Sequence, residues 1–233
     1  MWGFVDCTRY YLSEGRPHVV LYNASLVVET REKVALLVRP GQGKSTIMKM
    51  LAGIDLPDSG AVLRDEGGWP LGYAGGFHND MSGDANIRCL AQFAGVDPLE
   101  LSAFCFEFSE LGEFYHQPLK LYSSTMRARL ALAASLGLPA KTYLADDKLA
   151  AGDERFRHKC MTELNAKLAG CGLIFVASNP RPAKDVCDRF YVVSGGQFLP
   201  CDDYDHAADL LAASLDDDTS VSEEADIPTF DLV

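Results

Sequence analysis

The segment from residue 38 to residue 47, VRPGQGKSTI, contains the residue types that bind phosphate. Gly43, Lys44 and Ser45 match the end of the pattern G-x-x-x-x-G-K-[ST], in which glycines let backbone N–H groups approach an anion. The lysine of this pattern reaches the β- and γ-phosphates of a nucleoside triphosphate, and the next hydroxyl ligates Mg²⁺. The residues predicted to bind the nucleotide here are Gly41, Gln42, Gly43, Lys44, Ser45 and Thr46.

The pattern is incomplete at one position, because its first glycine falls on Val38. A β-branched residue held at a positive φ would cost about 1–3 kcal/mol. The backbone donors come after this position, so residues 41 to 46 still supply their N–H groups. The sequence therefore supports nucleotide binding more directly than it supports hydrolysis.

Two adjacent acids end a second apolar run, in YLADD. In a nucleotide-binding protein the first acid after such a strand, here Asp146, holds Mg²⁺ through a bound water, and the second, Asp147, orients the attacking water. On their own the two acids are also compatible with a solvated strand end. The phosphate-binding loop is what favours a metal site.

The elements that must position these residues are a sheet and an inserted group of helices. Residues 34–38, VALLV, are apolar throughout, which is typical of a strand buried on both faces of a parallel sheet. Asp97 and Pro98 form a helix start within a mainly helical stretch, residues 79–138. Strand patterns and a hairpin turn follow at 142–145, 173–177 and Gly195-Gly196. This order predicts an α/β fold, a P-loop NTPase core sheet with a helical subdomain at about 79–138.

Composition limits the class of protein. The chain has 233 residues, 48% of them hydrophobic, and a net charge of −12, which argues against nucleic acid as the main partner. No apolar run approaches the roughly 18 residues of a membrane span, and the start lacks a signal-peptide core, so we expect a cytoplasmic protein. The seven cysteines form no C-x-x-C pair and are expected to be reduced. The acidic segment 211–233 is expected to be a disordered tail, with a docking role for its last residues as the alternative.

Residues 121–160, LYSSTMRARLALAASLGLPAKTYLADDKLAAGDERFRHKC, carry a more specific likeness. They resemble the ATP-binding subunits of ABC transporters that export polysaccharide, in particular the capsular-polysaccharide and O-antigen group. The signature of that group reads Y-S-S-G-M-R-A-R-L, and here Thr125 stands at its glycine. The resemblance extends from about residue 5 to residue 208 and implies an ABC-type nucleotide-binding domain over residues 1–210.

The resemblance implies ATP and Mg²⁺ as ligands and two kinds of protein partner. Tyr11 stands where the family stacks an aromatic ring on adenine, although Tyr10 is an alternative. In the family two ATP-binding subunits close head to tail, as a homodimer or heterodimer. Each subunit then directs its signature helix at the γ-phosphate bound by the other, and the resemblance assigns Ser123, Ser124 and Thr125 to this task. Contacts near residues 77–90 would drive a polytopic membrane permease, which implies a location on the inner face of the cell membrane.

Three catalytic positions depart from the family. His78 stands at a glutamine that contacts Mg²⁺ and water, Asp147 at the catalytic glutamate, and Ser178 at a histidine that contacts the γ-phosphate. The predicted catalytic residues are thus Asp147, His78 and Ser178, and the predicted metal ligands are Ser45, Asp146 and His78. Asp147 is shorter than glutamate by roughly 1.5 Å, and near-attack geometry is sensitive to such a displacement.

These departures leave two hypotheses of different class. In the first, the chain couples MgATP binding and slow hydrolysis to polysaccharide export. In the second, it is a degenerate partner subunit that binds ATP without turnover and has a structural or regulatory role. A soluble ATPase acting on nucleic acid is a third possibility, which the acidity of the chain disfavours.

Overall fold

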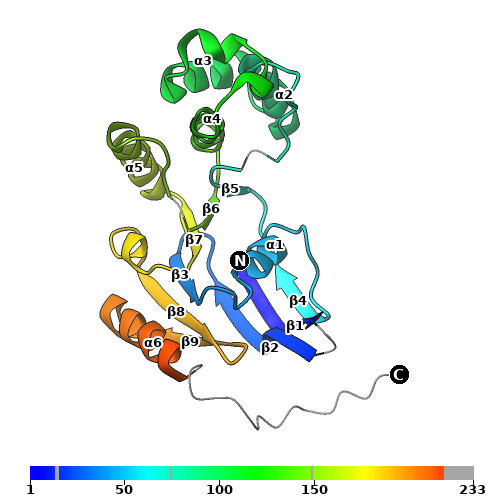
Figure 1. The fold of residues 1–233 in the computed structure, drawn as a ribbon, viewed down its shortest axis with the longest axis vertical. Helices are drawn as coiled ribbons and strands as arrows, with labels where there is room; N and C mark the ends of the chain where they lie inside the picture. Colours follow the sequence, from blue (N-terminus) through cyan, green and yellow to red (C-terminus); the bar gives the residue numbers. More distant parts are fainter. Residues whose placement is uncertain (14–15, 74, 148, 218–233) are drawn as a thin grey trace.

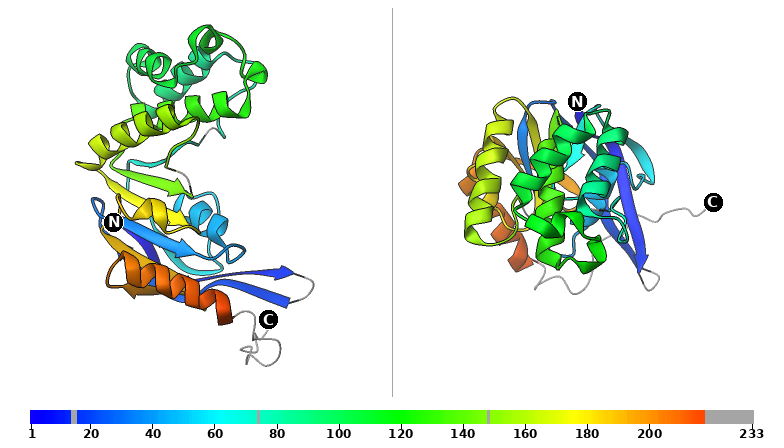
Figure 2. Two further views of the ribbon diagram at one scale, coloured as in Figure 1. Left: turned by 60° about the vertical axis from the view of Figure 1, so that its left-hand side comes forward. Right: turned by 90° about the horizontal axis from the view of Figure 1, so that it is seen from above.

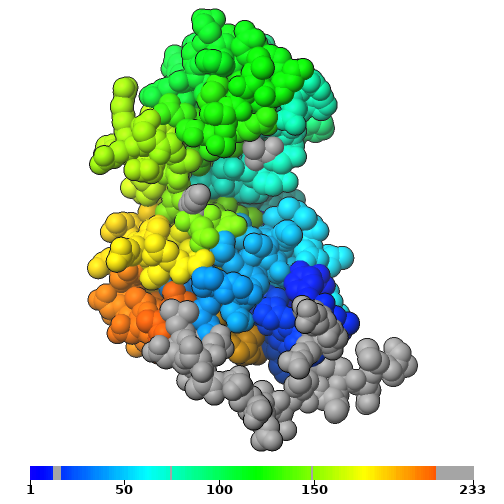
Figure 3. All heavy atoms as spheres, viewed as in Figure 1, coloured from blue at the N-terminus to red at the C-terminus, as the bar shows by residue number. Residues whose placement is uncertain are grey.

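The computed structural model describes residues 1–13, 16–73, 75–147 and 149–217 of the chain (Figure 1). Strands and their flanking helices form one lobe, and a group of helices forms a second lobe beside it (Figures 1 and 2). In the space-filling view the helical lobe, in green, stands above the sheet lobe (Figure 3). In the described part of the chain, no helix is both long and apolar enough to cross a membrane.

The larger of the two sheets in the described residues has the strand order β5-β6-β7-β3-β8-β9. All pairs are parallel except β8 with β9, which form the hairpin predicted at Gly195-Gly196. Its strands are β3 (Lys33–Val38), β5 (Gly68–Pro70), β6 (Thr142–Asp146), β7 (Gly172–Ala177), β8 (Arg189–Ser194) and β9 (Gln197–Cys201). Because β3, β6 and β7 are adjacent and parallel, the residues after their carboxyl ends meet at one edge of the sheet.

A second, antiparallel sheet has the order β2-β1-β4. Its strands are β1 (Trp2–Ser13), β2 (Arg16–Val28) and β4 (Ser59–Leu63). The sequence did not reveal β1, because register shifts between Phe4 and Tyr10 interrupt the period-two alternation of a strand.

Two cores lie on opposite faces of the larger sheet. Along β3, Val34 and Leu36 belong to the core shared with the antiparallel sheet and α1 (Lys44–Leu51), whereas Ala35 and Leu37 belong to the other. The second core includes residues of α5 (Glu154–Leu168) and α6 (Tyr204–Asp217). This alternation confirms that VALLV is a strand buried on both faces.

The helical lobe contains α2 (Gly83–Ala94), α3 (Pro98–Ser109) and α4 (Ser124–Gly137). The Asp97 side chain accepts hydrogen bonds from the N–H groups of Leu99 and Glu100, which confirms the predicted helix start. All three helices lie within 79–138, and the subdomain boundary itself stays a prediction. Three short 3₁₀ helices complete the described elements: η1 (Gly112–His116), η2 (Leu119–Leu121) and η3 (Arg181–Ala183).

The start of the predicted tail needs a correction. Residues from 211 to Asp217 belong to α6, and Leu211 is buried in the core, so this part of 211–233 is helical. The apolar side of α6 packs on the sheet, and this packing outweighs the acidic composition that had suggested disorder. Residues 218–233 lie outside the described residues.

Candidate nucleotide-binding site

The phosphate-binding loop connects β3 to α1, as the sequence predicts. Gly41 and Gly43 have φ values of +83° and +88°. Gly43 is the N-cap residue of α1, so no side chain caps the first turn of this helix. At the start of α1 the N–H of Thr46 donates to the carbonyl of Gly43 at 2.9 Å, and the preceding N–H groups, of Lys44 and Ser45, can donate to an anion. A Cβ at position 43 would overlap the Val20 side chain, so both shape and backbone conformation require glycine there.

Val38 does not carry the strain that the motif suggested. It is the last residue of β3, is fully buried, and pairs with Val193 of β8. It is not among the residues with positive φ, so a β-branched side chain fits there without a backbone penalty. The departure at this position therefore gives no physical reason to expect weaker phosphate binding.

Lys44 joins the loop to the two acids at the end of β6. Its Nζ atom forms a short ion pair with Asp146 and a second one, at 2.7 Å, with Oδ2 of Asp147. The Lys44 side chain is only 17% exposed, whereas the side chains of Asp146 and Asp147 are 43% and 38% exposed, so the two acids stay open to solvent. The structure thus brings together three of the predicted site residues, from β3–α1 and from β6.

Asp147 and Ser178 contact each other directly. The N–H of Ser178 donates to Oδ1 of Asp147 at 2.8 Å, and the Ser178 hydroxyl donates to the same atom at 3.2 Å. Asp147 also adopts φ = +50°, an uncommon conformation for a residue other than glycine. The hydrogen bonds from Ser178 hold Oδ1 of Asp147, and the ion pair with Lys44 holds Oδ2. These contacts offset the cost of the backbone conformation.

The amine of Lys44 and the carboxylate of Asp147 each stabilise the charged form of the other. Partial burial alone would raise the pKa of Asp147, but the hydrogen bonds from Lys44 and Ser178 bring that pKa below its ordinary value. Desolvation would likewise lower the pKa of Lys44, but the carboxylates of Asp146 and Asp147 raise it. At neutral pH the carboxylate of Asp147 is therefore ionised and the amine of Lys44 is protonated.

Tyr11 lies beside the far end of the loop. Its hydroxyl accepts a hydrogen bond from Oγ1 of Thr46 at 3.1 Å and donates one to Oδ2 of Asp55 at 3.0 Å. The contact with Thr46 favours Tyr11 over Tyr10 as the residue next to a bound base, since neighbouring strand residues point to opposite faces. The role of Tyr11 in stacking stays a prediction.

His78 lies in the segment before α2 and is exposed. Within the described residues its hydrogen bonds all stay between residues 78 and 86, including one from the N–H of Asp80 to Nδ1 at 3.3 Å. The structure therefore does not bring His78 to Lys44 or the two acids. Its predicted catalytic and metal roles are without geometric support in this single chain.

Asn86 is a positioning residue that the sequence did not single out. It is 4% exposed, and its Nδ2 atom donates to the carbonyl groups of His78, Met81 and Ser82. Its Oδ1 atom accepts from the N–H of His78 at 2.7 Å. One buried side chain thus fixes the whole segment that carries His78.

Replacing Asn86 by aspartate is expected to lower the free energy of unfolding by about 2–4 kcal/mol, because a carboxylate cannot donate to three carbonyl groups. Urea unfolding followed by circular dichroism measures the loss. The control is Asn165→Asp on the exposed side of α5, which makes the same chemical change and should stay within about 0.5 kcal/mol. Equal effects of the two substitutions would contradict the positioning role.

The signature residues form a helix start, but in the other lobe. The Ser123 hydroxyl caps α4 by accepting from the N–H of Met126 at 3.2 Å, so Ser124 and Thr125 occupy the first turn. Figure 1 shows α4 in the helical lobe and α1 in the sheet lobe. Within one chain the predicted binding residues therefore form two separate groups, one at 41–46 and one at 123–125.

Arg129 of α4 connects the helical lobe to the sheet lobe. Its guanidinium pairs with Asp153 at 2.5 Å and with Glu110 at 3.7 Å, and it lies over the Phe156 ring. Its side chain is only 16% exposed, so Arg129 is a structural connection between the two lobes. Asp153 also caps α5 by accepting from the N–H of Phe156.

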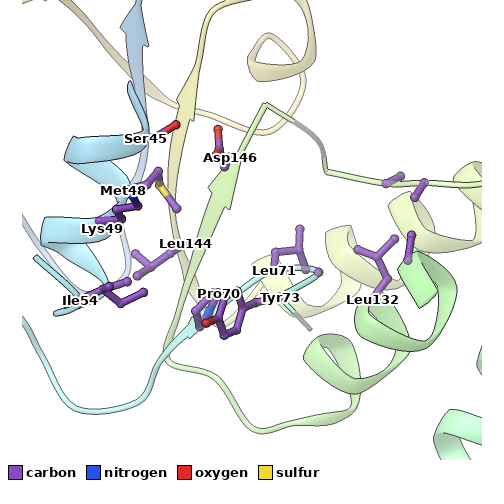
Figure 4. Close-up of a pocket in the computed structure, with 15 residues that line it drawn as sticks. Ser45, Met48, Lys49, Ile54, Pro70, Leu71, Tyr73, Leu132, Leu144 and Asp146 are labelled. Carbon is purple, nitrogen blue, oxygen red and sulfur yellow. The ribbon is translucent and has the colours of Figure 1, made fainter. Parts of the chain in front are cut away.

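A cavity of about 640 Å³ separates α1 from α4 (Figure 4). Most of its lining is apolar, and its polar end contains Ser45 and Asp146. Both side chains offer oxygen atoms, which are the ligands that Mg²⁺ prefers, so the donor set present fits a magnesium ion. This fit supports Ser45 and Asp146, but not the nitrogen donors of His78, as the metal ligands.

With this geometry established, known proteins can be compared. Residues 21–150 match the family model described as ABC transporter. The ATP-binding protein BexA of Haemophilus influenzae is 37% identical over 202 residues, which cover 86% of this chain and 93% of that protein. The capsule polysaccharide export ATP-binding protein CtrD of Neisseria meningitidis serogroup B is 36% identical over 201 residues, 86% of this chain and 93% of that protein.

Solved structures give the same fold. The structure of an ATP-binding subunit of an ABC transporter aligns with a TM-score of 0.77 at 19% identity, covering 93% of this chain and 99% of that one. The ATP-binding cassette MJ0796, in a dimeric post-hydrolysis state bound to ADP and Pi, aligns with a TM-score of 0.71 at 20% identity and covers 85% and 96%. These structures confirm the predicted P-loop NTPase fold, and the sequence matches show that the chain belongs to the ABC transporter family as an ATP-binding protein.

Proposed function

We propose that this chain is the ATP-binding subunit of an exporter for a capsular-type polysaccharide, and that it binds MgATP and hydrolyses it slowly. The observation that carries the proposal is the meeting of Lys44, Asp146, Asp147 and Ser178 at one edge of the sheet. The substrate class is supported by relatives such as CtrD and the polysialic acid transport protein KpsT of Escherichia coli, which is 36% identical over 196 residues.

The residues of the site have separate tasks in this proposal. The loop at residues 41–46, through its N–H groups that are not bonded within the loop, and the amine of Lys44 bind the phosphates. Ser45 and Asp146 hold Mg²⁺, which supplies positive charge against the phosphate oxygens. Asp147 orients the attacking water. Its side chain is shorter than that of a glutamate by roughly 1.5 Å, and this is one physical reason to expect slow turnover.

Binding of a triphosphate requires Lys44 to exchange partners. In this structure its amine is shared between Asp146 and Asp147, while the proposed role directs it at phosphate oxygens. The phosphates would supply negative charge to the Lys44 amine, and Asp146 would help to hold Mg²⁺, while Asp147 keeps its hydrogen bonds from Ser178. The ion pair thus holds the side chains near their proposed working positions.

The partners and the location follow the family. The chain pairs head to tail with a second ATP-binding subunit, identical or different, so that Ser123, Ser124 and Thr125 of one face the loop at 41–46 of the other. This arrangement explains why the two groups of predicted binding residues are separate within one chain. The pair acts on a polytopic membrane permease, which puts the chain on the inner face of the cell membrane.

Replacing Lys44 by alanine is expected to abolish ATP turnover, because it removes the phosphate-binding amine and leaves Asp146 and Asp147 unpaired. Phosphate release by the purified subunit, reconstituted with its membrane partner, measures the rate of turnover. The control is Lys33→Ala, which removes a lysine that pairs with Asp188 at the other end of β3. If the unchanged chain releases phosphate no faster than Lys44→Ala, the proposed hydrolysis is wrong. The chain would then be a subunit that binds ATP without turnover.

A further inference from the structure

A group of charged and aromatic side chains lies beside the phosphate-binding loop, and we call it the Arg9 cluster. It consists of Arg9, Tyr11, Thr46, Asp55 and Asp58. Two of these residues come from β1, one from α1 and two from the segment between α1 and β4. None of the roles in an ATP site assigned above requires Arg9, so its many contacts need a separate explanation.

The guanidinium of Arg9 is held by two carboxylates. Its Nη2 atom donates to both oxygens of Asp55, at 3.2 and 3.1 Å, and its Nη1 atom donates to Oδ1 of Asp58 at 2.9 Å. The Arg9 side chain is only 18% exposed. A planar guanidinium bound to two carboxylates has little freedom to rotate, so its plane is fixed.

This fixed plane covers one face of the Tyr11 ring. The central carbon of the guanidinium lies 4.6 Å from the ring centroid. The hydroxyl of Tyr11 is meanwhile held by Thr46 and Asp55. The ring is thus restrained at its tip and on one face, yet Tyr11 is still 39% exposed.

These restraints have a chemical consequence for a stacking partner. A planar base can reach Tyr11 only on the face that Arg9 does not cover. A cation on the covered face also withdraws electron density from the ring, which favours stacking of an electron-rich purine on the other face. Because the ring does not have to be ordered when the base binds, less conformational entropy is lost on binding.

We propose that Arg9 is a positioning residue for the nucleotide base: with Asp55 and Asp58 it holds Tyr11 so that a purine stacks on its uncovered face. This inference rests on the proposed function, in which residues 41–46 bind the triphosphate. If the inference is right, different residues bind the two parts of the nucleotide. The Arg9 cluster positions Tyr11 for the base, and the loop at residues 41–46 binds the phosphates.

The test measures two affinities for each variant of the full chain by isothermal titration calorimetry, one for MgATP and one for Mg-tripolyphosphate, which has no base. Arg9→Met keeps a long side chain but removes the charge. We expect it to weaken MgATP binding about five- to tenfold and to leave tripolyphosphate binding within about twofold. Arg9→Lys keeps the cation without the planar fork and should recover part of the loss.

A matched control is Arg189→Met, because Arg189 also pairs with a carboxylate, Glu32 at 2.6 Å, and lies over a tyrosine, Tyr191. It lies at the start of β8 and should change neither affinity. If Arg9→Met weakens both ligands equally, or weakens neither, the positioning role is wrong although ATP binding stands. If the unchanged chain binds neither ligand, the proposed function itself fails.

Discussion

Replacing Asp147 by asparagine is expected to slow ATP hydrolysis by about 10²–10³-fold while ATP still binds. Both oxygens of Asp147 accept from donors, Oδ1 from Ser178 and Oδ2 from Lys44. When ATP is bound and Lys44 has turned to the phosphates, a carboxamide presents an NH₂ group either to Ser178 or to the attacking water, so either the contact that positions the side chain or the acceptor for that water is lost. The N–H groups at 41–46 are unchanged, which is why binding persists. Phosphate release at saturating ATP, together with calorimetry, separates the two effects.

The control for Asp147→Asn is Asp188→Asn, which removes the same charge from the ion pair with Lys33. It should leave turnover unchanged. A rate in Asp147→Asn within about threefold of the unchanged chain would assign the orienting role to another group.

The contribution of Ser178 can be separated in the same experiment. Ser178→Ala removes the hydroxyl bond at 3.2 Å but keeps the backbone bond at 2.8 Å to Asp147. If Ser178 acts through Asp147, its effect on turnover is absent in the Asp147→Asn background. An equal effect in both backgrounds would instead indicate direct contact between Ser178 and the substrate.

The parts of the site that the sequence predicts are those that depend on local rules. The phosphate-binding loop is a run of neighbouring residues, and a strand followed by glycines and a helix can form it almost independently of the rest of the chain. Asp146 joins it because parallel strands place their carboxyl ends at one edge. The start of α4 was instead expected from the resemblance, which assigned Ser123, Ser124 and Thr125 to a helix N-terminus, and Ser123 is the cap of that helix.

The parts that the sequence does not predict depend on contacts between distant segments. Arg9 and Asp55 carry no motif, and their contact arises only because β1 and the segment after α1 pack together. Resemblance assigned Ser178 to the γ-phosphate, whereas in this structure it donates to Asp147. Only the three-dimensional arrangement shows that these two departures from the family occur at residues in contact.

The second large effect is expected from Gly43→Ala, which should weaken ATP binding on the order of 30-fold, about 2 kcal/mol. The alanine must adopt a φ near +88°, which is unfavourable for a residue with a side chain. Its Cβ would also overlap the side chain of Val20, which is buried and stiff at χ1. The free loop can relieve this overlap by moving. In the bound state the N–H groups must converge on phosphate, so the cost appears in the affinity for MgATP, which calorimetry measures.

Two further glycines separate the causes of this loss. Gly41→Ala meets the same backbone requirement, φ +83°, in open space, so it should weaken binding less than Gly43→Ala. Gly95→Ala, at the end of α2 with φ +69° and also in open space, should lower stability without changing the affinity for ATP. Equal losses in Gly41→Ala and Gly43→Ala would mean that backbone strain, and not contact with Val20, sets the requirement for glycine. An unchanged affinity in Gly43→Ala would mean that the loop does not bind phosphate in the arrangement that its backbone presents.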